Sequence, residues 1–318
     1  MGFGRHDADA WASYTTGATA TRGSMKTARM AADILTSTEI DDTLKAKNIE
    51  VREARDSALN PLSLPIVLAL DCTGSMSVVI FNAIKKFNLI IEELVDKKAV
   101  EDPAIMTMFF DDVNFVGERA LQVSQFESDL EATKQFEKMH IVGNGGGNNS
   151  ESYHLPLYMA AFKTKIDSME KRNTKGFLFT VGDEAMPPPL TPEQIKQVFG
   201  PDESAPQSLS YMDLWEAAGR KYHCFHVVAM GGSFASGEGE KRMKEHWKPI
   251  GQNLIILDDM ESLPEVVVST IRIVNGEDAK TVASSWSGTT AVTVSKATKH
   301  LAKKAKGKGG DGPGVAKL

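Results

Sequence analysis

The chain has 318 residues, of which 42% are hydrophobic and 25% charged, proportions typical of a folded globular protein. Its formal net charge of −6 implies no general attraction to nucleic acid or to an anionic membrane surface. No apolar run approaches the ~20 residues that a membrane-spanning helix needs, and residues 1–22 contain no apolar signal core. We therefore expect a cytoplasmic protein without membrane contact, or a virion-associated one if the chain comes from a phage.

Residues 1–60 are predicted to form an N-terminal arm. Residues 1–22 are rich in Gly, Ala, Thr and Ser, and residues 24–36 have the apolar spacing of a short helix. Residues 38–57 carry many charges around Leu44 and Ile49, which is typical of a solvated helix or an extended linker. Such an arm would wrap the following domain or engage a partner.

Strand-like and helix-like segments alternate over residues 61–276, which we predict to be one domain. The expected strands are 64–71, 104–110, 114–123 (a polar edge strand), 176–181, 222–230 and 253–257. The expected helices are 77–95, 127–139, 150–169, 191–199, 211–220, 238–247 and 261–274. This alternation predicts an α/β fold with a doubly wound, mostly parallel, Rossmann-like sheet covered by helices on both faces.

The two cysteines, Cys72 and Cys224, end or lie inside such apolar runs. Small buried thiols are favoured there over a disulfide. Free thiols also fit a reducing compartment.

Oxygen-bearing side chains follow the first strand of the domain. The apolar run 66–70 ends at Asp71, and Thr73 and Ser75 follow at every second position. Ligands bind at the carboxyl ends of strands in open α/β sheets, and oxygen donors suit a hard cation such as Mg²⁺ rather than zinc or copper. The alternative is that Thr73 or Ser75 caps the following helix.

The run Asp71-Cys72-Thr73-Gly74-Ser75-Met76 resembles the D-x-[ST]-G-S-M signature of von Willebrand factor A (vWA) domains. The wording of residues 51–57, 125–129, 145–148 and 170–172 also resembles an uncharacterised bacterial and phage subgroup of vWA proteins. The resemblance covers about residues 62–275. It implies a metal-ion-dependent adhesion site (MIDAS) that holds Mg²⁺, or Mn²⁺ or Ca²⁺, through side chains of three loops. The implied metal ligands in this sequence are Asp71, Thr73, Ser75, Ser150 and Asp183.

The second loop runs through Gly145-Gly146-Gly147 to Ser150. Family members often read Gly-Gly-Thr-x-Thr here, so the resemblance implies Ser150 as the ligand, with Asn148 as the alternative. Glu151 would cap the next helix or hydrogen-bond a metal-bound water. A flexible loop or a phosphate-binding turn is the alternative interpretation, but no Gly-Lys-[Ser/Thr] follows as in a P-loop.

The third loop departs from the family pattern. Family members commonly end this strand in Thr-Asp-Gly, whereas this chain reads Val181-Gly182-Asp183-Glu184. Asp183 is the expected metal ligand, and Glu184 is the alternative. Asp71 and Asp183 would lie near one another at the strand ends, where their repulsion would be costly without a cation.

Residues 277–318 are predicted to form a Ser/Gly/Lys-rich basic tail. A short strand is possible at 290–294, and six lysines lie between Lys296 and Lys308. Such a segment has little to bury, so we expect a solvated tail. Weak contact with nucleic acid or an acidic partner is the alternative.

The resemblance implies a binding module without enzymatic activity. The metal would be completed by an Asp or Glu of a protein partner, possibly an AAA+ ATPase or an assembly subunit, so the chain would act as an adaptor or scaffold. One alternative is a structural component of a phage or other assembly with metal-independent contacts. A Mg²⁺-dependent phosphohydrolase would need acid–base groups, for which His140 and His154 are the candidates, whereas His223 and His226 are expected in the core.

Overall fold

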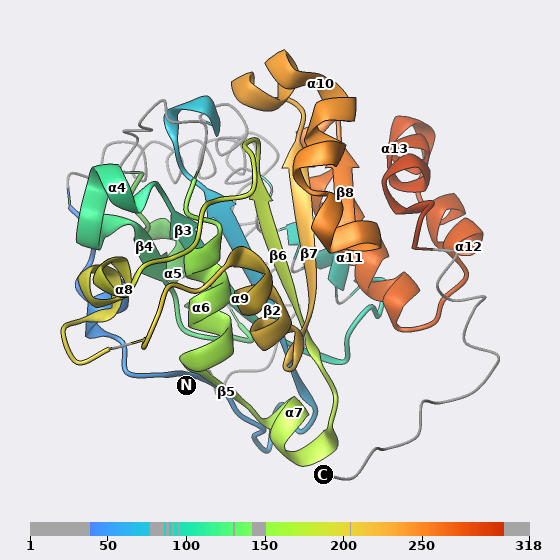
Figure 1. The fold of residues 1–318 in the computed structure, drawn as a ribbon. Coiled ribbons are helices and arrows are strands. Elements are labelled where there is room, and N and C mark those ends of the chain that lie inside the picture. The colour runs from blue at the N-terminus through green and yellow to red at the C-terminus, as the bar shows by residue number, and fades with distance from the viewer. Residues whose placement is uncertain are drawn as a thin grey trace, which may run out of the picture.

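The fold is built around a mixed six-stranded sheet with strand order β4-β3-β2-β6-β7-β8 (Figure 1). A computed structural model describes residues 39–76, 96–129, 131–141, 151–203 and 205–301, with 86, 89, 90 and 92–94. The strands are β2 (Ser63–Asp71), β3 (Asp102–Phe110), β4 (Leu121–Val123), β6 (Gly176–Gly182), β7 (Tyr222–Ala229) and β8 (Leu254–Leu257). All neighbours are parallel except β3 and β4. The predicted α/β, doubly wound, mostly parallel fold is confirmed.

Strand β2 needs an unbroken apolar run because both of its faces are buried. Successive side chains of a strand point to opposite faces, so Leu68 and Leu70 join the apolar cluster on one face of the sheet. Val67 and Ala69 join the cluster on the other face. The strand order reverses at β2, with β3 on one side and β6 on the other. Such a reversal is where ligands bind in sheets of this kind.

Helices cover both faces of the sheet, as Figure 1 shows. They are α4 (Val113–Val116), α5 (Glu131–Glu137), α6 (His154–Phe162), α7 (Asp167–Arg172), α8 (Pro192–Phe199), α9 (Tyr211–Gly219), α10 (Ser233–His246), α11 (Leu263–Val274), α12 (Ala279–Ser284) and α13 (Gly288–Thr298). The described residues between 86 and 96 are also helical, in the predicted helix 77–95. None of the described helices is long and apolar enough to span a bilayer.

Shorter elements complete the body. The 3₁₀ helices are η1 (Ala46–Asn48), η2 (Gly74–Met76), η3 (Gly117–Arg119), η4 (Lys248–Asn253) and η5 (Met260–Ser262). Strands β1 (Arg52–Ala54) and β5 (Thr164–Ile166) form a separate parallel pair. The start of α8 follows its sequence signal, because Thr191 and Gln194 form a reciprocal capping box ahead of Pro192.

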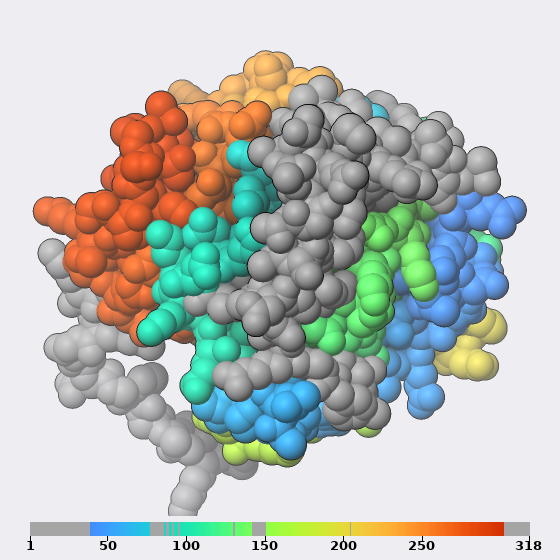
Figure 2. Space-filling view, turned by 180° about the vertical axis from the view of Figure 1, so that it is seen from behind, coloured from blue at the N-terminus to red at the C-terminus, as the bar shows by residue number. Residues whose placement is uncertain are grey.

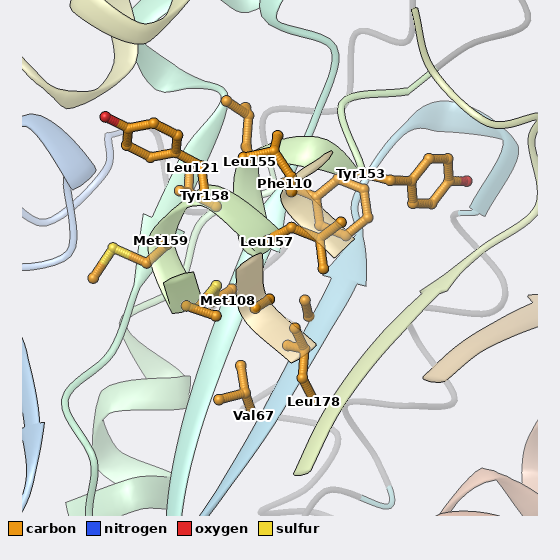
Figure 3. Packing of buried hydrophobic residues seen from close by; sticks show 14 of the residues in the cluster. Val67, Met108, Phe110, Leu121, Tyr153, Leu155, Leu157, Tyr158, Met159 and Leu178 are labelled. Carbon is orange, nitrogen blue, oxygen red and sulfur yellow. The ribbon is translucent and has the colours of Figure 1, made fainter. Parts of the chain in front are cut away.

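The sheet packs tightly against α6 on one face. Figure 3 shows Val67, Met108 and Leu178 of the sheet beside Leu157 of α6. The hydroxyl groups of Tyr153 and Tyr158 point to opposite sides of this cluster in the same view. The apolar bodies of both tyrosines therefore belong to the core, while their polar ends reach its edges.

Three element predictions are wrong. The expected strand 114–123 is mostly the helices α4 and η3, and only β4 pairs, antiparallel to β3 at the edge of the sheet. The expected helix 150–169 stops at Phe162, because Thr164–Ile166 pairs with β1. The possible strand at 290–294 lies inside helix α13. In each case the packing of the segment against the rest of the fold outweighs the strand or helix propensity of its residues.

The described part of the expected arm packs against the sheet rather than forming a solvated helix. Ile40 and Leu44 are buried in the core cluster, and Ile49 in the cluster on the opposite face. The Arg52 guanidinium donates hydrogen bonds to the carbonyl oxygens of Thr43 and Val123, at 2.5 and 2.9 Å. These contacts hold Thr43 and Arg52 beside the end of β4.

Helices α12 and α13 pack on α11, so the folded body continues past residue 276 to Leu301. Val282 and Val294 are fully buried in the core cluster. The Trp286 indole N–H donates to Ser269 Oγ at 2.8 Å. Figure 2 shows these C-terminal helices, in red, on the outside of the molecule. Residues 302–318 lie outside the described ranges.

Candidate functional site

Four of the five predicted metal ligands come together at the carboxyl ends of β2 and β6. Asp71 Oδ1 accepts hydrogen bonds from the Thr73 N–H at 3.0 Å and from Thr73 Oγ1 at 2.6 Å. Thr73 Oγ1 lies 3.2 Å from Ser75 Oγ, which donates to Asp183 Oδ1 at 2.7 Å. A continuous chain of polar contacts therefore joins the two loops. Ser150 and its alternative Asn148 fall outside the described residues.

We use the name acidic site for Asp71, Thr73, Ser75 and Asp183, together with the carboxyl groups of Glu151 and Glu184 that surround them. Asp71 and Asp183 are 0% exposed, although carboxylates are rarely buried without a compensating charge. In the described residues no Lys, Arg or His forms an ion pair with any of these four carboxyl groups. Glu151 Oε2 and Glu184 Oε2 also lack a hydrogen-bond partner there.

Burial makes these carboxyl groups hard to ionise. Loss of hydration raises the pKa of Asp71 to about 8, against the hydrogen bonds from Thr73, and repulsion from Asp183 adds to the rise. Burial also raises the pKa of Asp183 and brings that of Glu184 to about 7. For Glu151, burial and the charge of Asp71 raise the pKa to about 10. The acidic site therefore favours either protons or an added cation.

Asp183 reaches the site although it follows Gly182, whereas vWA domains commonly have the aspartate before the glycine. Its Oδ2 accepts a hydrogen bond from the Phe234 N–H in the first turn of α10, at 2.9 Å, where the helix dipole favours negative charge. A Cβ at Gly232 would lie only 2.3 Å from Asp183 Oδ2, so that position must be glycine for the carboxylate to fit. The Gly182-Asp183 order is thus accommodated by the backbone at the start of α10.

Tyr153 is a central residue of the acidic site that the sequence pattern missed. Its hydroxyl donates to Asp71 Oδ2 and accepts the Glu184 N–H, both at 3.0 Å. Its ring packs edge-on against Phe110 and Trp247. A Cβ at Gly182 would lie 2.2 Å from the Tyr153 hydroxyl oxygen, so glycine there leaves room for it. Only the glycine before Asp183 gave a hint of this close approach.

Glu184, the fallback ligand, is tied down through its backbone. Its carbonyl oxygen accepts the Trp247 indole N–H at 2.9 Å, and its N–H is held by Tyr153. Its side chain is 6% exposed. Glu151 does not cap α6, whose N-cap residue is Tyr153 and makes no side-chain cap.

The histidines near the site are poor acid–base candidates. His154 is buried, and loss of hydration lowers its pKa to about 3. His140 lies next to β4, where its backbone exchanges hydrogen bonds with the Gln122 side chain. His226 is a core residue as predicted, stacked 3.6 Å from the Trp247 ring and bonded to Thr180 through Nδ1 at 2.9 Å. The His223 ring packs on Phe177.

The donor set of the acidic site fits a hard cation. In the described ranges no three His, Cys, Asp or Glu side chains could hold a metal by themselves. Hydroxyl groups would therefore have to contribute, and Thr73 and Ser75 lie between the two buried aspartates to do so. Both cysteines are buried free thiols, and Cys72 points away, donating to its own strand at Leu70 O.

No family model matches the chain, and no curated protein matches it. Two crystal structures of the pilus adhesin SpaC from Lactobacillus rhamnosus GG, one in an open conformation, resemble it with 10% sequence identity and TM-scores of 0.47 and 0.45. The match covers 68% of this chain but only 31% of the adhesin, so the chain spans less than a third of that protein's length. A structural similarity with this sequence identity and these TM-scores does not indicate the function of the chain.

Proposed function

We propose that this chain is a vWA-like protein-binding module that acts as an adaptor or scaffold. In this proposal the acidic site binds Mg²⁺, or Mn²⁺ or Ca²⁺, through Asp71, Thr73, Ser75, Ser150 and Asp183. When bound, the cation supplies a positive charge that an Asp or Glu side chain of the partner approaches. An AAA+ ATPase or an assembly subunit is the kind of partner we propose.

One observation carries the proposal: two buried aspartates are joined by two hydroxyls without a basic partner in the described residues. Isolated buried charges are strongly unfavourable and are normally paired or bound to metal. A divalent cation would offset both carboxylates and would lower their pKa values toward the ordinary range. The same arrangement without a cation must retain protons.

The residues of the chain would prepare the site in distinct ways. The Thr73 N–H and Tyr153 hydroxyl orient the two oxygens of Asp71, and the Phe234 N–H orients Asp183. Such fixed orientation reduces the entropy lost when an ion binds. Thr73 and Ser75 retain lone pairs for coordination when their hydrogens point at the carboxylates.

A binding role is favoured over hydrolysis because neither of the two histidines considered for acid–base chemistry, His140 and His154, bonds to a residue of the acidic site among the hydrogen bonds of the described residues. His154 stays neutral throughout the physiological range, since burial holds its pKa near 3. Phosphoryl chemistry with a metal normally uses such a group or a second metal in addition. We therefore propose no enzymatic activity.

The proposal is tested by replacing Asp71 with the isosteric Asn. Mg²⁺ or Mn²⁺ binding is measured by calorimetry on wild type, Asp71→Asn and the exposed control Asp202→Asn, and partners are captured from lysate with Mg²⁺ or EDTA. We expect Asp71→Asn to lose at least about 100-fold in cation affinity and to lose the partners that EDTA also removes. Asp202→Asn should behave as wild type.

Retention of the same partners by Asp71→Asn and in EDTA would overturn metal-mediated binding. It would instead favour a structural component whose contacts do not need a metal. Absence of cation binding by wild type at millimolar Mg²⁺ would overturn the site itself.

A further inference from the structure

A pocket of about 350 Å³ lies between α10, η4, β8 and α13. Figure 1 shows α10, α13 and the edge strand β8 next to one another on one side of the molecule. The volume lies within the range of small-molecule sites, roughly 300–1,000 Å³. None of the residues that line this pocket belongs to the acidic site, although Trp247 lies between the two and contacts both.

The floor of the pocket is apolar because β8 is an edge strand. Ile255 and Leu257 are fully buried in the core, whereas the alternating residues Leu254 and Ile256 are half-buried and face the pocket. Ala297 of α13 also lines it. The floor therefore suits a flat apolar group about as large as a fused ring pair.

The rim of the pocket is basic. It carries four lysines and one glutamate: Lys244, Lys248, Lys296, Lys299 and Glu240. Two of the lysines are committed to acids, since Lys244 contacts Glu240 at 2.5 Å and Lys296 pairs with Asp258.

Lys248 and Lys299 carry the available charge. Lys248 is 78% exposed and lies 4.0 Å from Glu245, and Lys299 forms no ion pair in the described part of the chain. His300 also lines the pocket, but burial and nearby Lys299 lower its pKa, so it adds ring surface rather than charge at neutral pH. We use the name basic pocket for this cavity with its four lysines.

We propose that the basic pocket binds a small organic phosphomonoester, with its apolar body on Leu254, Ile256 and Ala297 and its phosphate facing Lys248 and Lys299. A dianion complements these two ammonium groups, because Lys299 forms no ion pair in the described part of the chain and Lys248 makes only the 4.0 Å pair with Glu245, which is itself exposed. Lysine binds phosphate as a point charge with three donors. This site is independent of the cation-dependent function proposed above. It assigns a ligand class to a region rich in lysine within a chain of net charge −6.

The test measures binding of 1-naphthyl phosphate to the full chain by calorimetry in EDTA, beside 1-naphthoate and inorganic phosphate. Naphthyl phosphate should bind at least about tenfold more tightly than either, because only it offers both the ring and the dianion. The double variant Lys248→Gln/Lys299→Gln should weaken its binding by about 100-fold, since each charge-assisted contact is worth about tenfold.

Lys241→Gln/Lys280→Gln is the matched control, because both lysines are exposed and lie outside the pocket while the charge change is the same. It should leave the affinity within about twofold. A second variant replaces Lys303, Lys304, Lys306 and Lys308 by Gln. The proposal is overturned if this second variant loses binding while the pocket double variant keeps it. Equal binding of 1-naphthoate, or no detectable binding of naphthyl phosphate by wild type, also overturns it.

Discussion

The acidic site and the basic pocket hold charge in opposite ways. At the acidic site Asp71 and Asp183 are fully buried and are satisfied by hydroxyls and backbone N–H groups. At the basic pocket the lysine side chains are about half or more exposed, as for Lys244 at 53% and Lys248 at 78%. Burial shifts the pKa of a charged group and couples it to stability, whereas exposure does neither to a large extent. The free energy of unfolding should therefore depend on pH and on substitutions at the acidic site. It should depend little on substitutions of the exposed lysines at the basic pocket.

The largest effect on stability is expected from Gly232→Ala. The added Cβ would lie 2.3 Å from Asp183 Cβ, an atom that cannot move away easily inside the site. We expect a loss of about 3 kcal/mol in the free energy of unfolding, at the upper end for overpacking, and weaker Mg²⁺ binding. Urea denaturation measures it. Gly219→Ala is the control, since no atom lies within 4 Å of its added Cβ, and stability equal to that control would contradict the packing argument.

Tyr153→Phe should have the next largest effect. It removes the hydroxyl that joins Asp71 to the Glu184 backbone while keeping the ring. We expect a loss of about 1–3 kcal/mol in stability from the unsatisfied buried groups, and a loss of about 10–100-fold in Mg²⁺ affinity.

The control for that variant is Tyr222→Phe, because Tyr222 is equally buried but bonds Thr164 Oγ1 far from the site. It should lose similar stability and keep its Mg²⁺ affinity. If the two variants bind Mg²⁺ equally well, Tyr153 does not position Asp71.

The pH dependence of stability should be smaller but specific. Burial raises the pKa of Asp71 in the folded state to about 8, above its ordinary value of 3.8, so the folded state binds a proton that the unfolded state releases. Its contribution is present below pH ~4 and is lost as the pH rises through about 8. In EDTA we expect a melting temperature at least about 2–4 °C lower at pH 8 than at pH 5.

Mg²⁺ should reverse this loss at pH 8 and have little effect at pH 5, where protons compete for the carboxylates. Differential scanning calorimetry at both pH values, with and without Mg²⁺, measures this. Asp71→Asn should flatten the profile in EDTA. A wild-type profile that rises toward pH 8 in EDTA would contradict the assigned direction.

The smallest effect is expected in the basic pocket. Lys248→Gln/Lys299→Gln should change the free energy of unfolding by less than about 0.5 kcal/mol without ligand, because exposed ion pairs contribute little. Urea denaturation of the ligand-free variant measures it. A loss of unfolding free energy as large as that of Tyr153→Phe would mean that these lysines stabilise the fold. It would contradict the expected difference between the buried acidic site and the exposed basic pocket.

Most strands of the sheet, and most residues of the candidate site, were predictable from the sequence. The apolar run ending at Asp71 predicted a strand buried on both faces, and the oxygen side chains after it predicted a polar strand end next to Asp183. These features are local, because strand burial and turn position follow from the order of residues along the chain. The partly changed motif around Gly182 did not prevent the contact between Ser75 and Asp183.

The groups that complete the site come from distant parts of the chain and are identified by its three-dimensional packing. Tyr153, the residue before α6, reaches Asp71 through the space left by Gly182. Phe234, in the first turn of α10, reaches Asp183 beside Gly232. The helical state of residues 290–294 and the basic pocket likewise depend on how α13 packs against β8 and α11. Contacts of this kind form when segments distant in the sequence are buried against one another. Patterns in short stretches of sequence do not report which distant segments pack together.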